Sequence, residues 1–243
     1  MNCTIVKNIR RCQLMYNVWW MTEENNYGDL LTPYIFDHFG IPYCYADLDN
    51  ADTICIGSIV KYATDNTLVL GSGLIKRKQK PNPNAIYKFV RGPLTRNRVI
   101  ELGGTCPEIY GDAAFLLPLF WKECAKEHEV GIVPHIYNYD EVKEKYPQYH
   151  IIDLTQDPKI VTQEITKCKR IISSSLHGLI VAHAYNIPAA WVKFSTKLVG
   201  DTIKFQDYYA SINVTPQLSS IETPKYSLGK IDINPIIDVF KNL

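Results

Sequence analysis

The chain alternates short apolar runs with amphipathic stretches of helical period, and the clearest such unit lies between residues 170 and 194. There an apolar strand at 171–172 is followed by a turn at 173–178, a helix to Tyr185 and a second strand at 189–192. Strand, helix and strand in this order predict a βαβ crossover with parallel strands. The turn then lies at the carboxyl end of a sheet, where ligands bind in open α/β folds.

The same alternation predicts secondary structure along most of the chain. Strands are expected at 16–21, 53–56, 67–70, 85–90, 107–110, 130–133 and 149–154. Helices are expected at 30–39, 94–102, 140–145, 158–169, 203–212 and 235–240. Strands and helices alternate in both halves, which indicates an α/β protein with two doubly wound, Rossmann-like lobes that face a cleft. We expect the N-terminal lobe at 1–121 and the C-terminal lobe at 122–243, with a charged linker at 122–129.

The turn at 173–178 carries residues suited to chemistry. Ser173, Ser174 and Ser175 precede a helix whose first amides point outward, an arrangement that favours an anion. His177 lies on the first turn of that helix, where its imidazole could reach the same ligand. A capped helix with a merely exposed histidine is the alternative that this motif alone leaves open.

Three further turns follow predicted strands of the first half. Asp29 ends an Asn/Gly-rich loop, where it either stabilises a helix N-terminus or holds a substrate hydroxyl. Gly71-Ser72-Gly73 lets the backbone approach a ligand closely, although it completes no dinucleotide-binding fingerprint. Arg91 is expected at the end of its strand, where a guanidinium suits a carboxylate or a phosphate.

The charge balance and the cysteine pattern restrict which partners and metal sites we expect. The chain has 26 Lys and Arg residues against 25 Asp and Glu residues, so we expect no nucleic acid partner and only a local anion site. The seven cysteines are scattered and never spaced as CxxC, which indicates free thiols in a reducing compartment rather than disulfides or zinc. Asp47-Leu48-Asp49 resembles a metal-binding DxD motif but lies in a polar connection, so we expect no metal there.

The N-terminal region offers no apolar core for a signal peptide, and its apolar run at 18–21 is too short to span a membrane. We therefore expect a cytoplasmic protein without an integral membrane segment. A peripheral contact with a membrane stays compatible with this sequence.

Four motifs, in this order, resemble the polysaccharide pyruvyl transferase family. They are Asn26-Tyr27-Gly28-Asp29, Val90-Arg91-Gly92-Pro93 with Gly111-Asp112-Ala113, Val133-Pro134-His135 and Ser173-Ser174-Ser175-Leu176-His177-Gly178. The resemblance covers residues 16–212. A later segment resembles members that act on bacterial exopolysaccharides, through Lys197, Gly200, Asp201, Lys204, Phe205, Asp207 and Tyr208.

The resemblance implies a two-domain fold like that of the glycosyltransferase B class. It also implies transfer of a carboxyvinyl unit from phosphoenolpyruvate onto two hydroxyls of one sugar, which forms a cyclic pyruvate ketal and releases phosphate. Phosphoenolpyruvate is then a co-substrate, and neither a metal nor an organic cofactor is implied. The implied partners are phosphoenolpyruvate and a free, lipid-linked or polymeric saccharide.

The resemblance also implies roles for single residues. Arg91 would hold the charged end of the donor, and His177 at the donor site is the candidate acid. Many relatives carry arginine two residues before this histidine, where this chain has Ser175. Lys197 or Lys204 is expected to supply the charge that the donor phosphate loses there.

A second histidine and a carboxylate complete the expected acid–base chemistry. His135 is the alternative acid, and either Asp29 or His135 would take the proton of the sugar hydroxyl. The remaining substrate contacts are expected at Ser173, Ser174, Ser175, Leu176, Gly178, Gly28, Gly71, Ser72, Gly73 and Asp112.

Two other functions compete with this reading. A glycosyltransferase of the same fold would need a carboxylate for the ribose hydroxyls of a nucleotide sugar, and Asp153 is the candidate. A non-catalytic saccharide-binding descendant of such an enzyme is the other possibility, because fold predicts function poorly. Trp19, Trp20 and Tyr27 either stack on a sugar or pack in the core.

Overall fold

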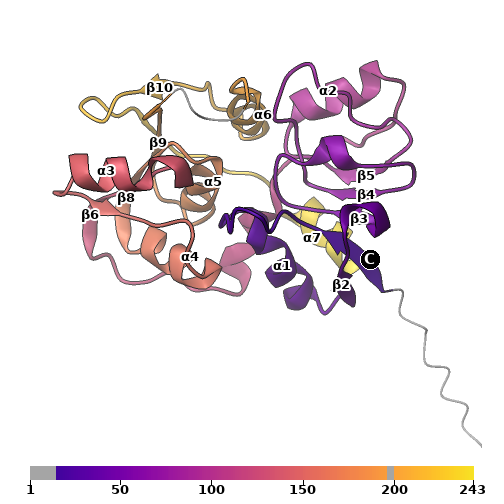
Figure 1. The fold of residues 1–243 in the computed structure, drawn as a ribbon, viewed down its shortest axis with the longest axis horizontal. Coiled ribbons are helices and arrows are strands. Elements are labelled where there is room, and N and C mark those ends of the chain that lie inside the picture. Colours follow the sequence, from indigo (N-terminus) through magenta and orange to yellow (C-terminus); the bar gives the residue numbers. More distant parts are fainter. Residues whose placement is uncertain (1–14, 196–199) are drawn as a thin grey trace, which may run out of the picture.

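The computed structural model describes residues 15–195 and 200–243, which form an α/β protein with two sheets built mainly from parallel strands. Figure 1 shows the sheets on opposite sides of the molecule, one built from the first half of the chain and the other from the second half.

The N-terminal sheet contains β1 (Tyr16–Trp19), β2 (Tyr43–Tyr45), β3 (Thr53–Ile54), β4 (Leu68–Leu70) and β5 (Ile86–Phe89). All of its strands pair in parallel, in the order β2-β1-β3-β4-β5. The chain passes from β1 to β2 on one side of the sheet and from β3 to β4 on the other, so the connections after β1 and β3 run in opposite directions. Such a switch point leaves a crevice outside the carboxyl ends of β1 and β3.

The C-terminal sheet contains β6 (His128–Val133), β7 (His150–Ile151), β8 (Cys168–Ser173), β9 (Ala189–Val192), β10 (Leu218–Ser219) and β11 (Tyr226–Ser227). Its parallel strands have the order β10-β9-β8-β6-β7, and β11 pairs with β9 in the antiparallel direction. The switch point lies between β6 and β8, which places a second crevice outside their carboxyl ends.

Helices connect and cover the strands. They are α1 (Thr32–Phe39), α2 (Pro93–Glu101), α3 (Tyr139–Lys145), α4 (Pro158–Thr166), α5 (Leu176–Ala184), α6 (Ile203–Ser211) and α7 (Asn234–Lys241). The 3₁₀ helices are η1 (Asp29–Leu31), η2 (Leu48–Asn50), η3 (Val60–Tyr62), η4 (Ala113–Leu119) and η5 (Ile136–Asn138). Proline begins α2 and α4, where its missing amide costs no helical hydrogen bond.

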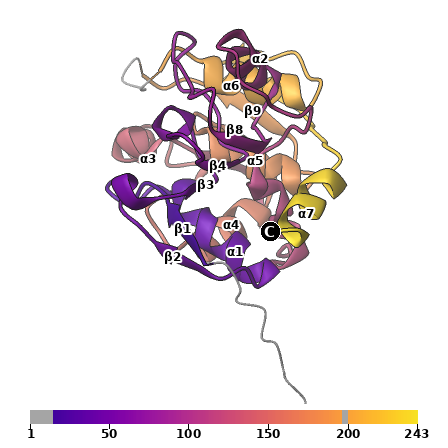
Figure 2. The ribbon, with the colours of Figure 1, turned by 90° about the vertical axis from the view of Figure 1, so that its right-hand side faces the viewer.

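The largest hydrophobic core runs through both halves of the chain. It joins Phe36 of α1 to Ile180 of α5, and η4 packs against both of these helices. The C-terminal helix α7 returns to the first half, where Phe240 stacks on Phe39 with ring centroids 5.1 Å apart. Figure 2, seen from the side of the N-terminal sheet, shows α7 beside that sheet. The expected boundary between lobes at residue 121 stays a prediction.

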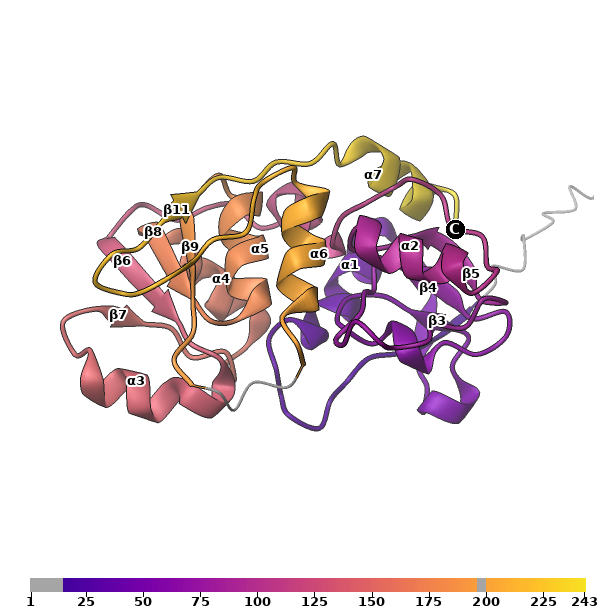
Figure 3. The same cartoon turned by 90° about the horizontal axis from the view of Figure 1, so that it is seen from above.

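Helix α6 stands between the two sheets, as Figure 3 shows. One side packs against the C-terminal sheet, where Phe205 stacks on Trp191 with ring centroids 4.6 Å apart. The other side packs against α2 of the first half. Residues of α6 therefore contact both halves of the chain.

Some elements differ from the sequence expectation. Residues 107–110 form no strand, only an isolated bridge between Val90 and Tyr110. The helix expected at 158–169 ends at Thr166, because Cys168 already pairs with His128 in β8. The short strands β2, β10 and β11 were not expected, since two or three residues establish no period.

Candidate active site

A cavity of about 80 Å³ lies where the two switch points meet. Its walls come from the loops that follow β1, β3, β6 and β8, the four strands that flank the two switch points, and from α6. The lining residues are Asn26, Asp29, Ser58, His135, Ser175, Leu176, His177 and Lys204. All but Leu176 are polar. The cavity brings together four of the expected site residues from the two halves of the chain, namely Asp29, His135, His177 and Lys204.

Two larger cavities lie elsewhere. One of about 140 Å³ is lined by α3 and by the residues at and after the ends of β9 and β10. Another of about 200 Å³ lies between η4, the end of α5 and the segment before α7. Neither lies at a switch point, and the smaller cavity is therefore the better candidate for chemistry despite its size.

His177 is buried in the wall of the cavity, on the first turn of α5. Its Nε2 atom lies 3.5 Å from Oδ2 of Asp112, the residue that caps η4. The other carboxylate oxygen of Asp112 accepts a hydrogen bond of 2.9 Å from the Ala114 amide. Asp112 was expected among the substrate contacts, and it lies behind the histidine rather than in the lining of the cavity.

Gly28 lies directly against the imidazole of His177. A Cβ atom on Gly28 would overlap with three atoms of the ring. The backbone of Gly28 is helical, with φ −62°, so any residue could adopt it. Glycine is needed here for space and not for conformational freedom, and its expected substrate contact stays untested.

Two opposite charges share the cavity. Burial raises the pKa of Asp29 to about 6, against the opposing effects of His177, Asn26 and Lys204. Burial also lowers the pKa of Lys204 to about 8, an effect that nearby Arg91 strengthens and Asp29 opposes. Near pH 7 the cavity therefore holds a carboxylate that is mostly ionised and an ammonium group that is mostly charged.

His135 is placed as a neutral imidazole. Burial lowers its pKa to about 4, and the charge of Lys204 acts in the same direction. Its backbone amide donates a hydrogen bond of 2.9 Å to Oγ of Ser174. Its Nδ1 atom is buried without a hydrogen bond to any described residue. A neutral imidazole near pH 7 can accept a proton, which suits a base better than an acid.

The N-terminus of α5 opens on the cavity through Ser175 and Leu176. Ser175 is the N-cap residue, but its side chain makes no capping hydrogen bond to the helix amides. Amides at a helix start carry partial positive charge and attract anions. This end of α5 is thus the second electropositive feature of the cavity, beside Lys204.

The other residues of the serine turn serve the backbone. Ser173 Oγ lies 2.8 Å from the carbonyl oxygens of Val133 and Ser175, and it accepts a hydrogen bond from the Ser175 amide. Ser174 Oγ accepts from the His135 amide. Gly178 gives room to Ser173 and Val133, with which a Cβ atom would overlap. These three residues hold β8, β6 and α5 together beside the cavity.

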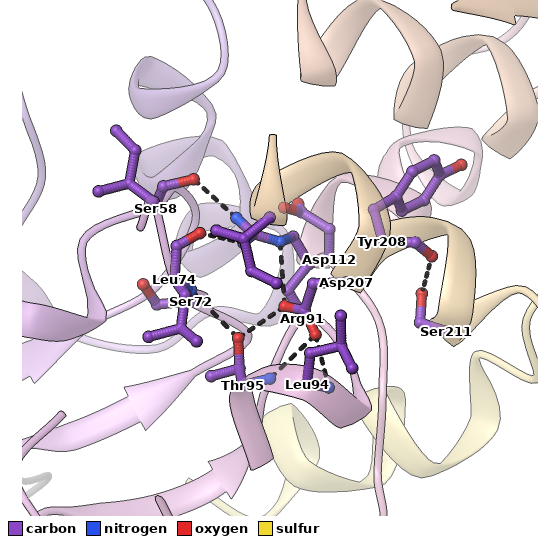
Figure 4. A network of polar contacts seen from close by, with 12 residues as sticks. Ser58, Ser72, Leu74, Arg91, Leu94, Thr95, Asp112, Asp207, Tyr208 and Ser211 are labelled. Carbon is purple, nitrogen blue, oxygen red and sulfur yellow. Dashed lines mark hydrogen bonds and ion pairs between the residues drawn. The ribbon is translucent and has the colours of Figure 1, made fainter. Parts of the chain in front are cut away.

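Arg91 lies fully buried behind the cavity and does not line it. Figure 4 shows its guanidinium in a polar network between the two halves. Nη1 donates to Oγ of Ser58 at 2.7 Å, Nη2 donates to the Leu74 carbonyl at 2.5 Å, and Nε lies 3.5 Å from Oδ2 of Asp207 on α6. The lining residue Ser58 therefore separates Arg91 from the space in which a donor would bind.

The glycine turn after β4 supports this arginine. Gly73 leaves the space that the guanidinium fills, because a Cβ atom there would press on Arg91. Ser72 Oγ donates to the Gly57 carbonyl and accepts from the Ile59 amide, which fixes the backbone on both sides of Ser58. Gly71, with φ +91°, packs against Phe89. Gly71, Ser72 and Gly73 thus make contacts within the fold, and their expected ligand contacts stay a prediction.

Asn26 and Ser58 line the cavity and were not expected as site residues. Asn26 donates a hydrogen bond of 2.9 Å to Oδ2 of Asp29. The signal for Ser58 was its place just after the strand β3, preceded by Gly57 with φ +118°. A residue at that position can be identified as a site residue only when the strand order shows that β3 flanks the switch point.

The aromatic candidates pack within the protein. Tyr27 shares a 2.7 Å hydrogen bond with Thr162 and is fully buried. Trp19 packs edge-to-face on Tyr62, and Trp20 packs on Tyr45 in the same way.

Lys197 and Asp153 are the two remaining polar residues for which the sequence suggested a role. Lys197 lies outside the described residues, so its expected role stays a prediction. Asp153 accepts hydrogen bonds from the amide and hydroxyl of Thr155 within its own turn.

Across residues 15–195 and 200–243, histidine, cysteine and acidic side chains form no group of three that could hold a metal ion. In the same residues, no helix combines the length and the apolar character needed to cross a bilayer.

Comparison with known proteins adds a family to this geometry. The model of the polysaccharide pyruvyl transferase family matches residues 87–195, which include Arg91, Asp112, His135 and His177. An uncharacterized protein of Acanthamoeba polyphaga mimivirus is 34% identical over 173 residues, which cover 65% of this chain and 59% of that protein. The succinoglycan biosynthesis protein ExoV of Rhizobium meliloti is 27% identical over 215 residues, which cover 81% of this chain and 65% of ExoV.

The chain thus spans 59% and 65% of the lengths of these two relatives. No solved structure matches it. The family match contains most of the cavity residues that come from the second half, as well as the arginine of the first half. Residues 87–195 therefore match the polysaccharide pyruvyl transferase family, and the chain is similar over most of its length to the succinoglycan biosynthesis protein.

Proposed function

We propose that the protein transfers the carboxyvinyl unit of phosphoenolpyruvate onto two hydroxyls of one sugar in a polysaccharide or its precursor. One observation carries the proposal: a single cavity at two switch points combines a lysine, an open helix N-terminus and an imidazole backed by a carboxylate. These groups suit a small dianionic donor that must be protonated during the reaction. The family match and the similarity to ExoV support pyruvyl transfer in polysaccharide biosynthesis.

The donor would bind by its two acidic groups. Its phosphate and carboxylate need at least two cationic or amide-rich contacts, which Lys204 and the first amides of α5 can supply. Arg91 would act from behind, by holding Ser58 and adding positive potential, rather than by direct contact. Lys204 is thereby our candidate for the charge that Ser175 does not provide.

The reaction would proceed by addition and displacement. A sugar hydroxyl oxygen bonds to the central carbon of the donor while His177 delivers a proton to the methylene carbon, which becomes a methyl group. A second hydroxyl then displaces phosphate from the same carbon, and its proton leaves with the phosphate or a base. General acid–base help of this kind contributes about 10²- to 10⁴-fold in rate.

Asp29 is the stronger candidate for the base that takes the sugar proton. With a pKa raised to about 6 it is mostly ionised near pH 7, yet basic enough to accept a proton. His135 is neutral at that pH and faces the same cavity, so it is the alternative.

The cavity is small for its proposed ligand. Its volume of about 80 Å³ lies below the ~300–1,000 Å³ that is typical of ligand pockets. A glycosyltransferase B-like arrangement, in which two lobes move apart to admit substrates, would resolve the difference. The five cysteines of the described residues are free thiols, which supports the further proposal of a reducing, cytoplasmic setting.

The test uses phosphate release. The protein is incubated with phosphoenolpyruvate and a panel of exopolysaccharide fragments and lipid-linked sugars, and the products are examined for a ketal methyl group by proton NMR. Phosphate release with ketal formation is expected. Binding of phosphoenolpyruvate without phosphate release would indicate a non-catalytic binding protein. Stabilisation by nucleotide sugars, but not by phosphoenolpyruvate, would indicate a glycosyltransferase.

A further inference from the structure

The contact between His177 and Asp112 joins two buried polar atoms that have no other partner. Nε2 of His177 and Oδ2 of Asp112 are both sealed from solvent and form no hydrogen bond with any described residue. They lie 3.5 Å apart, and their side chains are 9% and 1% exposed. This distance slightly exceeds the ~2.7–3.2 Å of an ordinary N–H···O hydrogen bond, so a small movement would close it. Catalytic hydrogen bonds are often this long before a substrate binds.

The carboxylate of Asp112 is fixed toward the imidazole by its own element. One oxygen caps η4 through the Ala114 amide, so the carboxylate cannot rotate without breaking that cap. Because η4 packs against α5, the second oxygen is held beside the first turn of that helix. A buried carboxylate oxygen without a donor is costly, and Nε2–H of His177, 3.5 Å away, is a donor that a small movement brings into reach.

Gly28 restrains the imidazole from another direction. Its α-carbon lies against the Nδ1, Cγ and Cε1 atoms of the ring, where a Cβ atom would overlap with them. His177 lines the cavity, and Nε2 but not Nδ1 is among its sealed, unpartnered polar atoms. The two ring nitrogens therefore face different surroundings, one a carboxylate and the other the donor space.

We infer that Asp112 is a positioning residue: it accepts a hydrogen bond from Nε2–H of His177, and Nδ1 becomes the nitrogen that exchanges a proton with the substrate. The effect of Asp112 on turnover rests on the proposed function, whereas its effect on the tautomer of His177 is independent of that function. A role confined to capping η4 would leave the tautomer of His177 unaffected.

Asp112→Asn separates these two roles. The amide oxygen can still accept from Ala114, so η4 keeps its cap. The amide NH₂ would then face Nε2 and favour the opposite tautomer, with Nε2 as acceptor and the proton on Nδ1. Asp157→Asn is the matched control, because Asp157 caps α4 through the Lys159 and Ile160 amides, outside the residues that line the cavity.

The readout is the ¹⁵N NMR spectrum of histidine-labelled protein, at a pH where the ring is neutral, with His177 assigned from a His177→Gln variant. Wild type and Asp157→Asn are expected to show Nε2–H, and Asp112→Asn to show Nδ1–H. A wild-type ring protonated on Nδ1, or an unchanged tautomer in a folded Asp112→Asn variant, would overturn the inference. The wild-type spectrum decides the question even if the variant fails to fold.

Turnover then connects the tautomer to the reaction. Asp112→Asn should lower kcat by about 10²-fold or more, with a small change in KM for phosphoenolpyruvate, because the donor contacts remain. Equal kcat in this variant and wild type would contradict a catalytic consequence of the positioning. If the tautomers are as expected but wild-type protein releases no phosphate, the proposed function fails and the positioning role stands.

Discussion

At the scale of single residues, the site is decided by what surrounds each ionisable group. Burial pushes the pKa of Asp29 up and that of Lys204 down, and each charge partly compensates the other. Burial and the charge of Lys204 lower the pKa of His135 to about 4 against a smaller opposing effect of Glu24, so this ring stays neutral. Asp29, Lys204 and His135 thus have pKa values displaced from those of free side chains, as is common at functional sites.

Gly28→Ala should disturb the imidazole without straining the backbone. The added methyl group must displace the ring of His177, so we expect a loss of turnover and a loss of about 1–3 kcal/mol of stability. The check is a double-mutant cycle by urea denaturation. On a His177→Ala background the same substitution should cost clearly less, since the ring is gone. Additive effects of the two substitutions would show that the overlap is relieved elsewhere.

Lys204→Ala should weaken donor binding about 10- to 100-fold, the value of one charged hydrogen bond. Because its pKa is lowered to about 8, the ammonium charge is lost as pH rises through 8, and kcat/KM for the donor should fall over that range. Lys204→Arg should keep its charge and move this decline to higher pH. Lys61→Ala, at an exposed lysine outside the cavity lining, is the control. Unchanged activity in both Lys204→Ala and Lys197→Ala would refute compensation by lysine.

At the scale of elements, α6 joins the two halves through one carboxylate. Oδ1 of Asp207 accepts hydrogen bonds of 2.9 and 3.0 Å from the Leu94 and Thr95 amides, so it caps α2 from another helix. Oδ2 accepts from the Thr95 hydroxyl at 2.6 Å and lies beside Arg91. Gly92 allows this approach, since a Cβ atom there would overlap with the Asp207 backbone. Figure 4 shows how closely these groups converge.

Asp207→Ala should therefore be strongly destabilising. It removes the cap of α2 and leaves the buried guanidinium of Arg91 without its carboxylate, for a loss of about 3–5 kcal/mol in the free energy of unfolding. Urea denaturation measures this. Asp207→Asn, which keeps an oxygen for the α2 amides, should cost less. Glu108→Ala breaks an exposed ion pair with Arg96 and should change stability by about 0.5 kcal/mol or less.

At the scale of the whole molecule, one buried histidine ties three elements of the second half together. His183 of α5 lies 3.0 Å from the Ser227 carbonyl of β11 through Nε2 and 2.6 Å from the Tyr208 hydroxyl of α6 through Nδ1. A carbonyl can only accept, so Nε2 carries the proton and Nδ1 accepts from Tyr208. Burial lowers the pKa of His183 to about 4, which keeps this ring neutral.

The stability of the fold should consequently fall in acid. Between about pH 6.5 and pH 4 the unfolded chain binds a proton at His183 that the folded protein does not, so stability decreases as pH falls, by up to about 1.4 kcal/mol per pH unit. His135 acts in the same direction, whereas Asp29, with its raised pKa, acts in the opposite one. Urea denaturation from pH 7 to pH 4.5 gives the slope. His183→Gln should make the slope of stability against pH shallower by about one proton. His38→Gln, at an exposed ring, should leave the slope unchanged. Equal slopes in wild type and His183→Gln would contradict the assignment of this pH dependence to His183.

Much of the fold could be predicted from the sequence because the relevant signals are local. The apolar period around 171–192 predicts the crossover of β8, α5 and β9, and the structure confirms it. The turns that follow strands were also recognisable, which is why Asp29 in the first half and His135 and His177 in the second half were expected as site residues. The shortest strands and the extended 3₁₀ helix η4 were missed, since they depend on their neighbours rather than on their own period.

The sequence by itself determined the order of the longer strands and helices, and with it the chemistry-bearing turns at the carboxyl ends of two sheets. Only the tertiary structure decided how those side chains are used. Arg91 is engaged by Asp207 and Ser58, and Asp112 faces His177 instead of the cavity. The physical reason is that hydrogen bonding and burial pair groups far apart in the chain, whereas sequence periodicity describes only which face each residue presents.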